Sequence, residues 1–237
     1  MIDINCDVGE GLQNESVIMP FISSCNIACG AHAGNIETMD NLIKLALQNN
    51  VLIGAHPSFP DKENFGRKIM DISNEILQKS IEDQLQLFKI RANLQKAEIH
   101  HVKPHGALYN LIAIDTEKAA VVVNAISTVF KSIKLYVPYN SAIEKIAKEA
   151  KIKIVYEAFA DRNYNDDLTL VSRGFPYAVI SDKEKVLKHV KRMSEQFLVR
   201  TVQDNNVIIK AETFCVHGDN KNVGEILRYL HEQLGIQ

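Results

Sequence analysis

The sequence predicts an α/β protein whose mostly parallel strands form a closed or nearly closed barrel. Segments with the pattern of strands alternate with segments with the pattern of helices along the whole chain, about seven of each. Such alternation is typical of right-handed crossovers in a parallel sheet. Clusters of polar residues follow many of the strands instead of gathering at one point, which favours a barrel over an open doubly wound sheet.

The first half of the chain opens with an alternating segment. Residues 2–6 alternate apolar and polar side chains, as a half-buried strand does. Further along, Met39, Leu42 and Ile43 share one helical face, and Leu77, Ile81 and Leu85 form a second apolar stripe. The predicted strands here are 2–6, 24–28, 51–53 and 99–102, and the predicted helices are 36–49 and 73–95.

The second half repeats the alternation. One helix is predicted to start near Asp115, and capping-box sequences at 141–144 and 181–184 mark two more helix starts. The remaining predicted strands are 135–137, 153–158 and 213–216, and a closing helix carries apolar residues from Val223 to Leu234. Because no linker or shift in composition divides the chain, we expect a single barrel domain over residues 1–237.

Composition excludes several classes of protein. The net charge is −2, with 46% hydrophobic and 24% charged residues, so the chain offers no basic surface for nucleic acid or an anionic membrane. No apolar run reaches the roughly 18–20 residues that span a bilayer, and the N-terminus lacks the features of a signal peptide. We therefore expect a cytoplasmic protein. Its four cysteines form no C-x-x-C pair and are expected to be buried thiols.

The first strand carries polar residues on one face. Alternation directs Asp3, Asn5 and Asp7 to one side, which in a barrel is the interior. Polar side chains in that position need hydrogen bonds, ion pairs or a ligand. One interpretation is a buried network that ties the barrel together. The other is a functional site, and it is stronger for Asp7 and Glu10, which lie at the exit of the strand.

Histidines follow two other predicted strands. His32 and His56 each lie among small residues at a strand exit, opposite a carboxylate such as Asp7. Imidazole and carboxylate groups together suit a divalent metal ion or general acid–base chemistry. The spacing matches no known metal-binding motif, and a structural role for each histidine is the alternative.

Charged residues also follow three later strands. Lys103 is suited to holding an anion and His105 to moving protons, unless both lie in a surface turn. Asp161 and Arg162 form either a salt bridge or, through Arg162, a site for a carboxylate. His217 and Asp219 follow the last strand.

Three further observations limit these functional assignments. The alternative for Asp219 is that its side chain only caps the final helix. Arg67 and Arg173 are loop arginines of the kind that is usually a solvated charge. No phosphate-binding glycine loop of the G-x-x-x-x-G-K-[ST] or G-x-G-x-x-G type occurs, so any nucleotide is held in another way or by another protein.

Several motifs, in order and spread over nearly the whole chain, resemble those of the LamB/YcsF family. They are Asp3-x-Asn5-x-Asp7-x-Gly9-Glu10-Gly11, Asn26-x-Ala28-Cys29-Gly30-x-His32-Ala33-Gly34, Gly54-Ala55-His56-Pro57-Ser58-x-Pro60-Asp61, Phe65-Gly66-Arg67, His101-Val102-Lys103-Pro104-His105-Gly106-x-Leu108-Tyr109-Asn110, Glu157-x-Phe159-Ala160-Asp161-Arg162 and Cys215-Val216-His217-Gly218-Asp219. The resemblance implies a TIM-like (β/α)7 barrel related to glycoside hydrolases and deacetylases. It also implies the A subunit of an ATP-hydrolysing 5-oxoprolinase, which opens 5-oxo-L-proline to L-glutamate with subunits B and C and with ATP as co-substrate.

On this basis each candidate residue receives an expected role. The expected catalytic residues are Asp7, Glu10, His105 and His217; the expected substrate- or phosphate-binding residues are Asn5, Lys103, Asp161, Arg162 and Asp219; and the candidate ligands of a divalent metal are Asp7, His32 and His56. Two alternatives remain open. One is a metal-dependent amide or acetyl hydrolase that acts alone, and the other is a non-catalytic subunit that positions its partners.

Overall fold

Seven parallel strands close into a barrel in the computed structural model, which describes residues 2–235. From β1 to β6 each strand pairs with the next one along the chain, β6 pairs with β9, and β9 closes the ring by pairing with β1. The strands are β1 (Asp3–Val8), β2 (Ser24–Ala28), β3 (Leu52–His56), β4 (Ile99–Val102), β5 (Lys134–Pro138), β6 (Lys153–Phe159) and β9 (Thr213–Cys215). The predicted fold class and all seven predicted barrel strands are confirmed.

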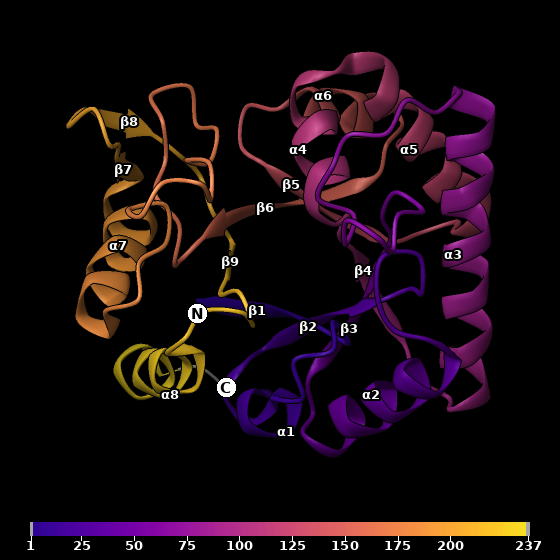
Figure 1. Ribbon diagram of the computed structural model, residues 1–237, viewed down its shortest axis with the longest axis horizontal. Helices are drawn as coiled ribbons and strands as arrows, with labels where there is room; N and C mark the ends of the chain where they lie inside the picture. The colour runs from indigo at the N-terminus through magenta and orange to yellow at the C-terminus, as the bar shows by residue number, and fades with distance from the viewer. Residues whose placement is uncertain (1, 236–237) are drawn as a thin grey trace.

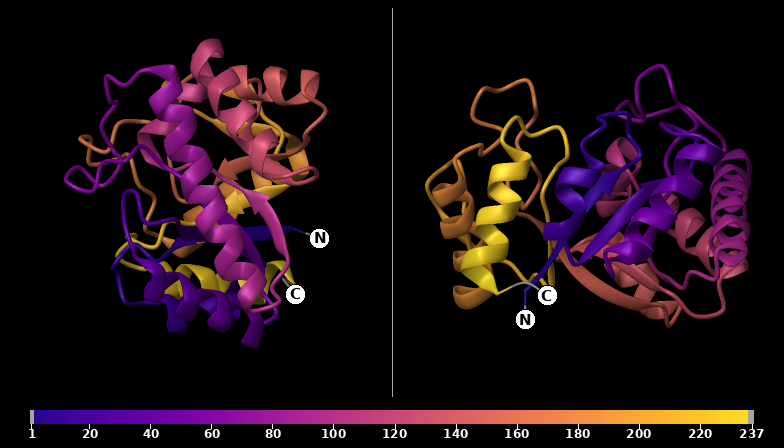
Figure 2. Two further views of the ribbon diagram at one scale, coloured as in Figure 1. Left: turned by 90° about the vertical axis from the view of Figure 1, so that its right-hand side faces the viewer. Right: turned by 90° about the horizontal axis from the view of Figure 1, so that it is seen from below.

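Helices surround this ring on its outside (Figure 1 and Figure 2). They are α2 (Ile36–Gln48), α3 (Asn74–Leu94), α4 (Gly106–Ile114), α5 (Thr116–Val129), α6 (Ala142–Glu149), α7 (Lys183–Gln196) and α8 (Val223–Leu234), with the short α1 (Glu15–Ile18) and the 3-10 turn η1 (Met19–Phe21) after β1. No helix within residues 2–235 combines the length and apolar character needed to cross a lipid bilayer.

The alternation in β1 separates two environments. Ile4 and Cys6 are fully buried in the apolar layer between strands and helices. Asn5, from the opposite face, donates to Glu157 Oε1 at 2.9 Å and to Thr213 Oγ1 at 2.8 Å, so it lies inside the barrel. The predicted polar interior is therefore present. The Asn5 amide group is satisfied there by hydrogen bonds between strands, as buried polar groups require.

Several predicted helix starts match the structure. Ser73 caps α3, Asp115 caps α5 by accepting from Lys118 N, and Ser141 caps α6 by accepting from Glu144 N. At 181–184 the predicted capping residue was wrong by one position. Asp182 accepts from Lys185 N at 2.9 Å, and a carboxylate at that position also interacts favourably with the helix dipole.

The last helix begins later than the sequence predicted. Its N-cap residue is Asn222, so Asp219 does not cap α8. Instead the Asp219 carboxylate accepts hydrogen bonds from two arginine side chains on other loops. The alternative that assigned Asp219 only a capping role is therefore wrong.

Two further features did not emerge from the sequence pattern. Helix α4 is apolar around most of its circumference, so its nine residues show no amphipathic stripe. Strands β7 (Leu198–Arg200) and β8 (Asn206–Ile208) form an antiparallel pair of only three residues each. All four cysteines are free and buried, as predicted.

Candidate functional site

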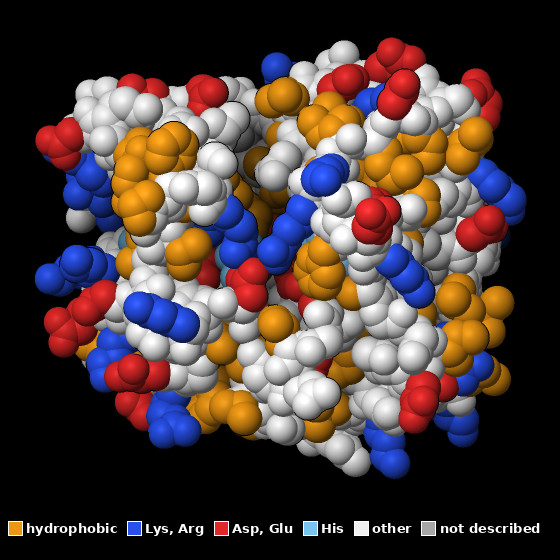
Figure 3. All heavy atoms as spheres, viewed as in Figure 1, with side chains coloured by type: hydrophobic (Ala, Val, Ile, Leu, Met, Phe, Trp, Pro, Cys, Tyr) orange, Lys and Arg blue, Asp and Glu red, His pale blue; other side chains and the backbone are white. Residues whose placement is uncertain are grey.

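A cavity of about 620 Å³ opens at the carboxyl ends of the barrel strands. Its lining includes eight of the residues predicted for the site: Asp7, Glu10, His56, Lys103, His105, Arg162, His217 and Asp219. The other three, Asn5, His32 and Asp161, do not line the cavity but contact residues that do. In the view of Figure 3 the molecular surface is hollowed near its middle, with basic and acidic side chains next to each other. The structure thus brings the strand exits together, as the barrel prediction requires.

Lys103 lies at the bottom of the cavity, where its side chain is 2% exposed. Its Nζ lies 2.9 Å from Asp7 Oδ1 and 2.9 Å from Glu157 Oε1, and it also contacts Cys215 Sγ at 3.1 Å. Burial alone would lower the pKa of Lys103, but the negative charges around it, Asp7 foremost, raise that pKa well above its usual value. The ammonium group is therefore charged and already paired with two carboxylates.

Beside this ion cluster, three histidines surround one carboxylate. Glu10 Oε1 lies 3.2 Å from His32 Nε2, 3.1 Å from His105 Nδ1 and 3.8 Å from His56 Nε2. The rings of His32 and His105 are stacked with their centroids 3.8 Å apart. Burial lowers the pKa of His32 to about 4, so this imidazole is neutral near pH 7.

This group differs from the metal ligands expected from the sequence. One donor atom from each of Glu10, His32, His56 and His105 lies within 4.8 Å of the donor atoms of the other three. Asp7, which the sequence favoured as a ligand, approaches His56 Nε2 at 3.5 Å but directs its other oxygen to Lys103. The four grouped residues are therefore the ones that could hold a metal ion.

On the opposite wall, Asp161 orients His217. His217 Nδ1 donates to Asp161 Oδ1 at 2.7 Å, and Asn220 donates to Asp161 Oδ2 at 3.0 Å. Burial raises the pKa of Asp161, but the interactions with His217 and Asn220 outweigh burial and hold that pKa below its ordinary value. With Nδ1 donating, Nε2 of the neutral His217 ring carries the lone pair. That arrangement suits a general base.

The Arg162 side chain, which lines the cavity, is bonded to backbone carbonyl groups. It donates from Nε to Ala178 O at 3.2 Å and from a terminal nitrogen to Val171 O at 2.6 Å. It therefore holds the loop after β6, and the alternative salt bridge with Asp161 is wrong because Asp161 pairs with His217.

Two arginines at the rim, Arg67 and Arg173, were interpreted from the sequence as solvated charges. Both donate to Asp219 Oδ2, at 2.8 Å and 2.9 Å, and so link three loops across the cavity mouth. Two guanidinium groups against one carboxylate leave a net positive charge there. Only the fold could reveal that these arginines contact Asp219, because the three residues are far apart in the sequence.

Two buried polar atoms of the cavity wall belong to motif residues for which the sequence suggested no role. Among the described residues, Tyr109 Oη and Glu157 Oε2 have no hydrogen-bond partner. Both residues line the cavity, so a bound ligand could satisfy them. Glu157 follows the alternation of β6 into the barrel, which was a usable signal, whereas Tyr109 lies on the unpredicted α4.

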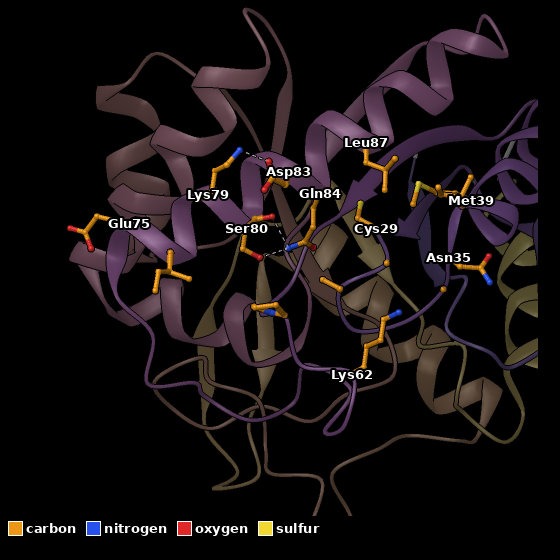
Figure 4. Close-up of a pocket in the computed structure, with 16 residues that line it drawn as sticks. Cys29, Asn35, Met39, Lys62, Glu75, Lys79, Ser80, Asp83, Gln84 and Leu87 are labelled. Atoms are coloured by element: carbon orange, nitrogen blue, oxygen red, sulfur yellow. Dashed lines mark hydrogen bonds and ion pairs between the residues drawn. The ribbon is translucent and has the colours of Figure 1, made fainter.

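A second cavity, of about 800 Å³, lies outside the barrel between α2 and α3 (Figure 4). Apolar atoms dominate its lining, and two of its charged side chains, Lys79 and Asp83, pair with each other at 2.6 Å. Its described residues include no converging set of acid–base or metal-binding groups, so the barrel mouth is the better candidate site.

Comparison with known proteins places the chain in a family. Residues 2–237 match the model of the LamB/YcsF family. A protein of Pyrococcus abyssi, named as the A subunit of 5-oxoprolinase, is 41% identical over 98% of this chain and 93% of its own length. One of the same name from Shouchella clausii is 42% identical over 92% of this chain and 88% of its own length. The crystal structure of a lactam utilization protein from Thermus thermophilus has a TM-score of 0.91 and 32% identity, covering 100% of this chain and 98% of that one. The chain therefore belongs to the LamB/YcsF family.

Proposed function

We propose that this chain is the A subunit of an ATP-dependent 5-oxoprolinase and that it acts with subunits B and C to open 5-oxo-L-proline to L-glutamate. The observation that carries the proposal is the cavity itself, in which an oriented histidine, unsatisfied polar atoms and a positive rim face the same space. The names of the curated relatives and of the Thermus protein give the substrate class, a small lactam.

The chemistry of a lactam explains the need for ATP. Amide resonance makes its carbonyl carbon a poor electrophile. Transfer of the γ-phosphoryl group to the lactam oxygen activates that carbon, water adds to it, and the C–N bond breaks as the nitrogen gains a proton. A second water then hydrolyses the acyl phosphate to glutamate and phosphate. Such a site needs a base for water, donors for developing negative charge and cations for the anionic groups.

The cavity supplies each of these groups. His217, oriented by Asp161, is placed to take a proton from water through Nε2. Arg67 and Arg173 at the rim are suited to the substrate carboxylate or a phosphate, because guanidinium groups bind such anions through two parallel hydrogen bonds. Tyr109, whose pKa is raised well above its usual value mainly by burial, remains a hydroxyl donor. The sequence has no phosphate-binding glycine loop, so we assign ATP to the assembled enzyme.

A reconstitution assay tests the proposal. The chain is combined with its candidate partners, and glutamate and ADP are measured together while each component is omitted in turn. We expect both products only from the complete mixture, and a loss of about 100-fold or more in the His217→Gln variant. No glutamate from the complete mixture, or an unimpaired His217→Gln variant, would count against it.

The histidine cluster favours one alternative, a metal-dependent amide hydrolase that acts alone. The same assay separates the two functions. Glutamate release by this chain without ATP or partners, and its loss after metal removal, would support the stand-alone hydrolase. Dependence on ATP and on every component would exclude it.

A further inference from the structure

The hydrogen bonds of three histidines determine which ring nitrogen carries the proton. His56 Nδ1 lies 2.7 Å from Lys103 O, and His105 Nε2 lies 3.0 Å from Phe65 O. Carbonyl oxygens only accept, so both of these nitrogens are donors. When each ring carries one proton, the remaining nitrogen, Nε2 of His56 or Nδ1 of His105, has a lone pair.

For His32, the hydrogen bond to a serine determines which ring nitrogen is the donor. Its Nδ1 lies 3.0 Å from Ser58 Oγ, and the Ser58 hydroxyl donates its own proton to Phe59 O at 2.8 Å. Ser58 Oγ can then only accept from His32, so His32 Nδ1 is the donor and its Nε2 carries a lone pair.

All three lone pairs point at one another and at a carboxylate. Glu10 Oε1 is 3.2 Å from His32 Nε2 and 3.1 Å from His105 Nδ1, and His105 Nδ1 is 3.0 Å from His56 Nε2. With one proton on each ring, four acceptors thus face one small volume without a donor among them, and Asp7 Oδ2, 3.5 Å from His56 Nε2, is a further acceptor at its edge. Buried acceptors in contact repel unless a cation lies between them.

We propose that Glu10, His32, His56 and His105 together bind one divalent transition-metal ion of the zinc class. Zinc–nitrogen and zinc–oxygen bonds of about 2.0–2.1 Å in a tetrahedron place the ligand atoms about 3.3–3.4 Å apart. The distances here, 3.0, 3.1, 3.2 and 3.8 Å, bracket that value. Histidine nitrogens with a carboxylate are a ligand set that zinc prefers, and each ring donates its outer N–H to an oxygen, as metal-bound histidines do.

Protons satisfy this cluster less well than a metal ion does. The His32 and His105 rings are stacked with their centroids 3.8 Å apart, and the His105 and His56 rings are 4.9 Å apart. Protonating more than one ring would place positive charges in contact. A single proton on His105 Nδ1 reaches Glu10 and His56, and one on His56 Nε2 reaches Asp7 and His105, but either arrangement leaves His32 Nε2 facing the carboxylate. One divalent ion satisfies all four atoms at once.

Metal uptake by the isolated full-length chain tests this proposal without reference to the reaction. The protein is stripped with a chelator, dialysed, and given Zn²⁺ or Co²⁺; bound metal is counted by mass spectrometry after free metal is removed. We expect about one ion per chain, with the visible absorption of tetrahedral Co²⁺. Glu10→Gln and His105→Asn should each weaken binding by about tenfold or more. His231→Gln, in α8 and outside the cluster, is the matched control and should bind as the wild type does.

A second measurement uses the wild type alone, so it tests the proposal even if the variants fail to fold. X-ray absorption of the zinc-loaded wild type should show nitrogen and oxygen ligands at about 2.0–2.1 Å with an imidazole contribution. A stripped, folded wild type that takes up neither ion in stoichiometric amount would overturn the proposal. So would folded Glu10→Gln and His105→Asn variants that bind zinc as tightly as the wild type.

Discussion

Replacing Lys103 by Met tests whether its ammonium group holds the barrel interior together. The side chain keeps its length but loses its charge, while Asp7 and Glu157 remain buried around it. At 2.9 Å and an effective dielectric constant near 20, each of the two ion pairs has a Coulomb energy of about 6 kcal/mol. Desolvation of the three ions offsets much of this energy, and breaking a buried pair typically costs about 3–5 kcal/mol. We expect the free energy of unfolding to fall by about that amount.

Urea unfolding at pH 7 of the metal-free protein, followed by circular dichroism, measures the loss. A loss of about 3–5 kcal/mol is a large fraction of the roughly 5–15 kcal/mol that stabilises most domains. Adding Glu157→Gln to Lys103→Met removes one of the two uncompensated charges. The double variant should therefore regain about 1–2 kcal/mol relative to Lys103→Met alone. A loss below about 1 kcal/mol for Lys103→Met, or no recovery in the double variant, would refute the reasoning.

Three further predictions follow from other parts of the molecule. In Gly54→Ala the new Cβ would overlap the His101 ring, so the ring must move, and we expect the free energy of unfolding in urea to fall by about 1–3 kcal/mol. Burial lowers the pKa of His189 to about 4 in the folded state, whereas the unfolded chain binds this proton near pH 6.5. Stability from His189 is therefore complete above pH 6.5 and is lost towards pH 4 at up to about 1.4 kcal/mol per pH unit, a dependence that His189→Gln should remove. Arg173→Ala, which takes one cation from Asp219, should raise KM for 5-oxoproline about tenfold in the reconstituted enzyme, with a smaller effect on kcat.

Each of these three predictions has its own control. Gly174→Ala adds a Cβ whose nearest contact, Ser172 Oγ, is 3.8 Å away, so it should leave stability within about 0.5 kcal/mol of the wild type. An equal loss in both glycine variants would contradict the clash. An unchanged slope of stability against pH in His189→Gln would show that other groups bind the proton. For the rim, Arg228→Ala in α8 should leave KM unchanged, and an equal rise in both arginine variants would argue against a local contact with substrate.

The fold was predictable because a barrel strand produces a simple alternation of apolar and polar residues in the sequence. In β1, Ile4 and Cys6 face the helices while Asn5 and Asp7 face the interior, and that alternation is visible without coordinates. The β7–β8 pair was not predictable in the same way, since three residues carry too little periodicity. For α4, an apolar surface around most of the helix removed the stripe that marks the other helices.

The location of the site was predictable to the same extent as the fold. Asp7, His56, His105 and His217 lie in or just after the carboxyl ends of different strands, and the carboxyl ends of parallel barrel strands meet at one rim, so these side chains line one cavity. The rim was not predictable, because Arg67 and Arg173 meet Asp219 only through the paths of three loops. A loop arginine looks the same in the sequence whether it is solvated or bound.

The chemistry of the histidine cluster depends on a further level of structure that local sequence does not encode. Glu10 reaches the histidines because Gly9 and Gly11 on either side of it adopt left-handed backbone angles, with φ of 79° and 82°. Which nitrogen of His105 carries the lone pair is decided by a carbonyl forty residues away, that of Phe65. A motif can therefore place a histidine at the right strand exit, but only the tertiary hydrogen bonds show that its lone pair faces Glu10. That orientation, and not merely the presence of three histidines, is the basis of the metal site that we propose.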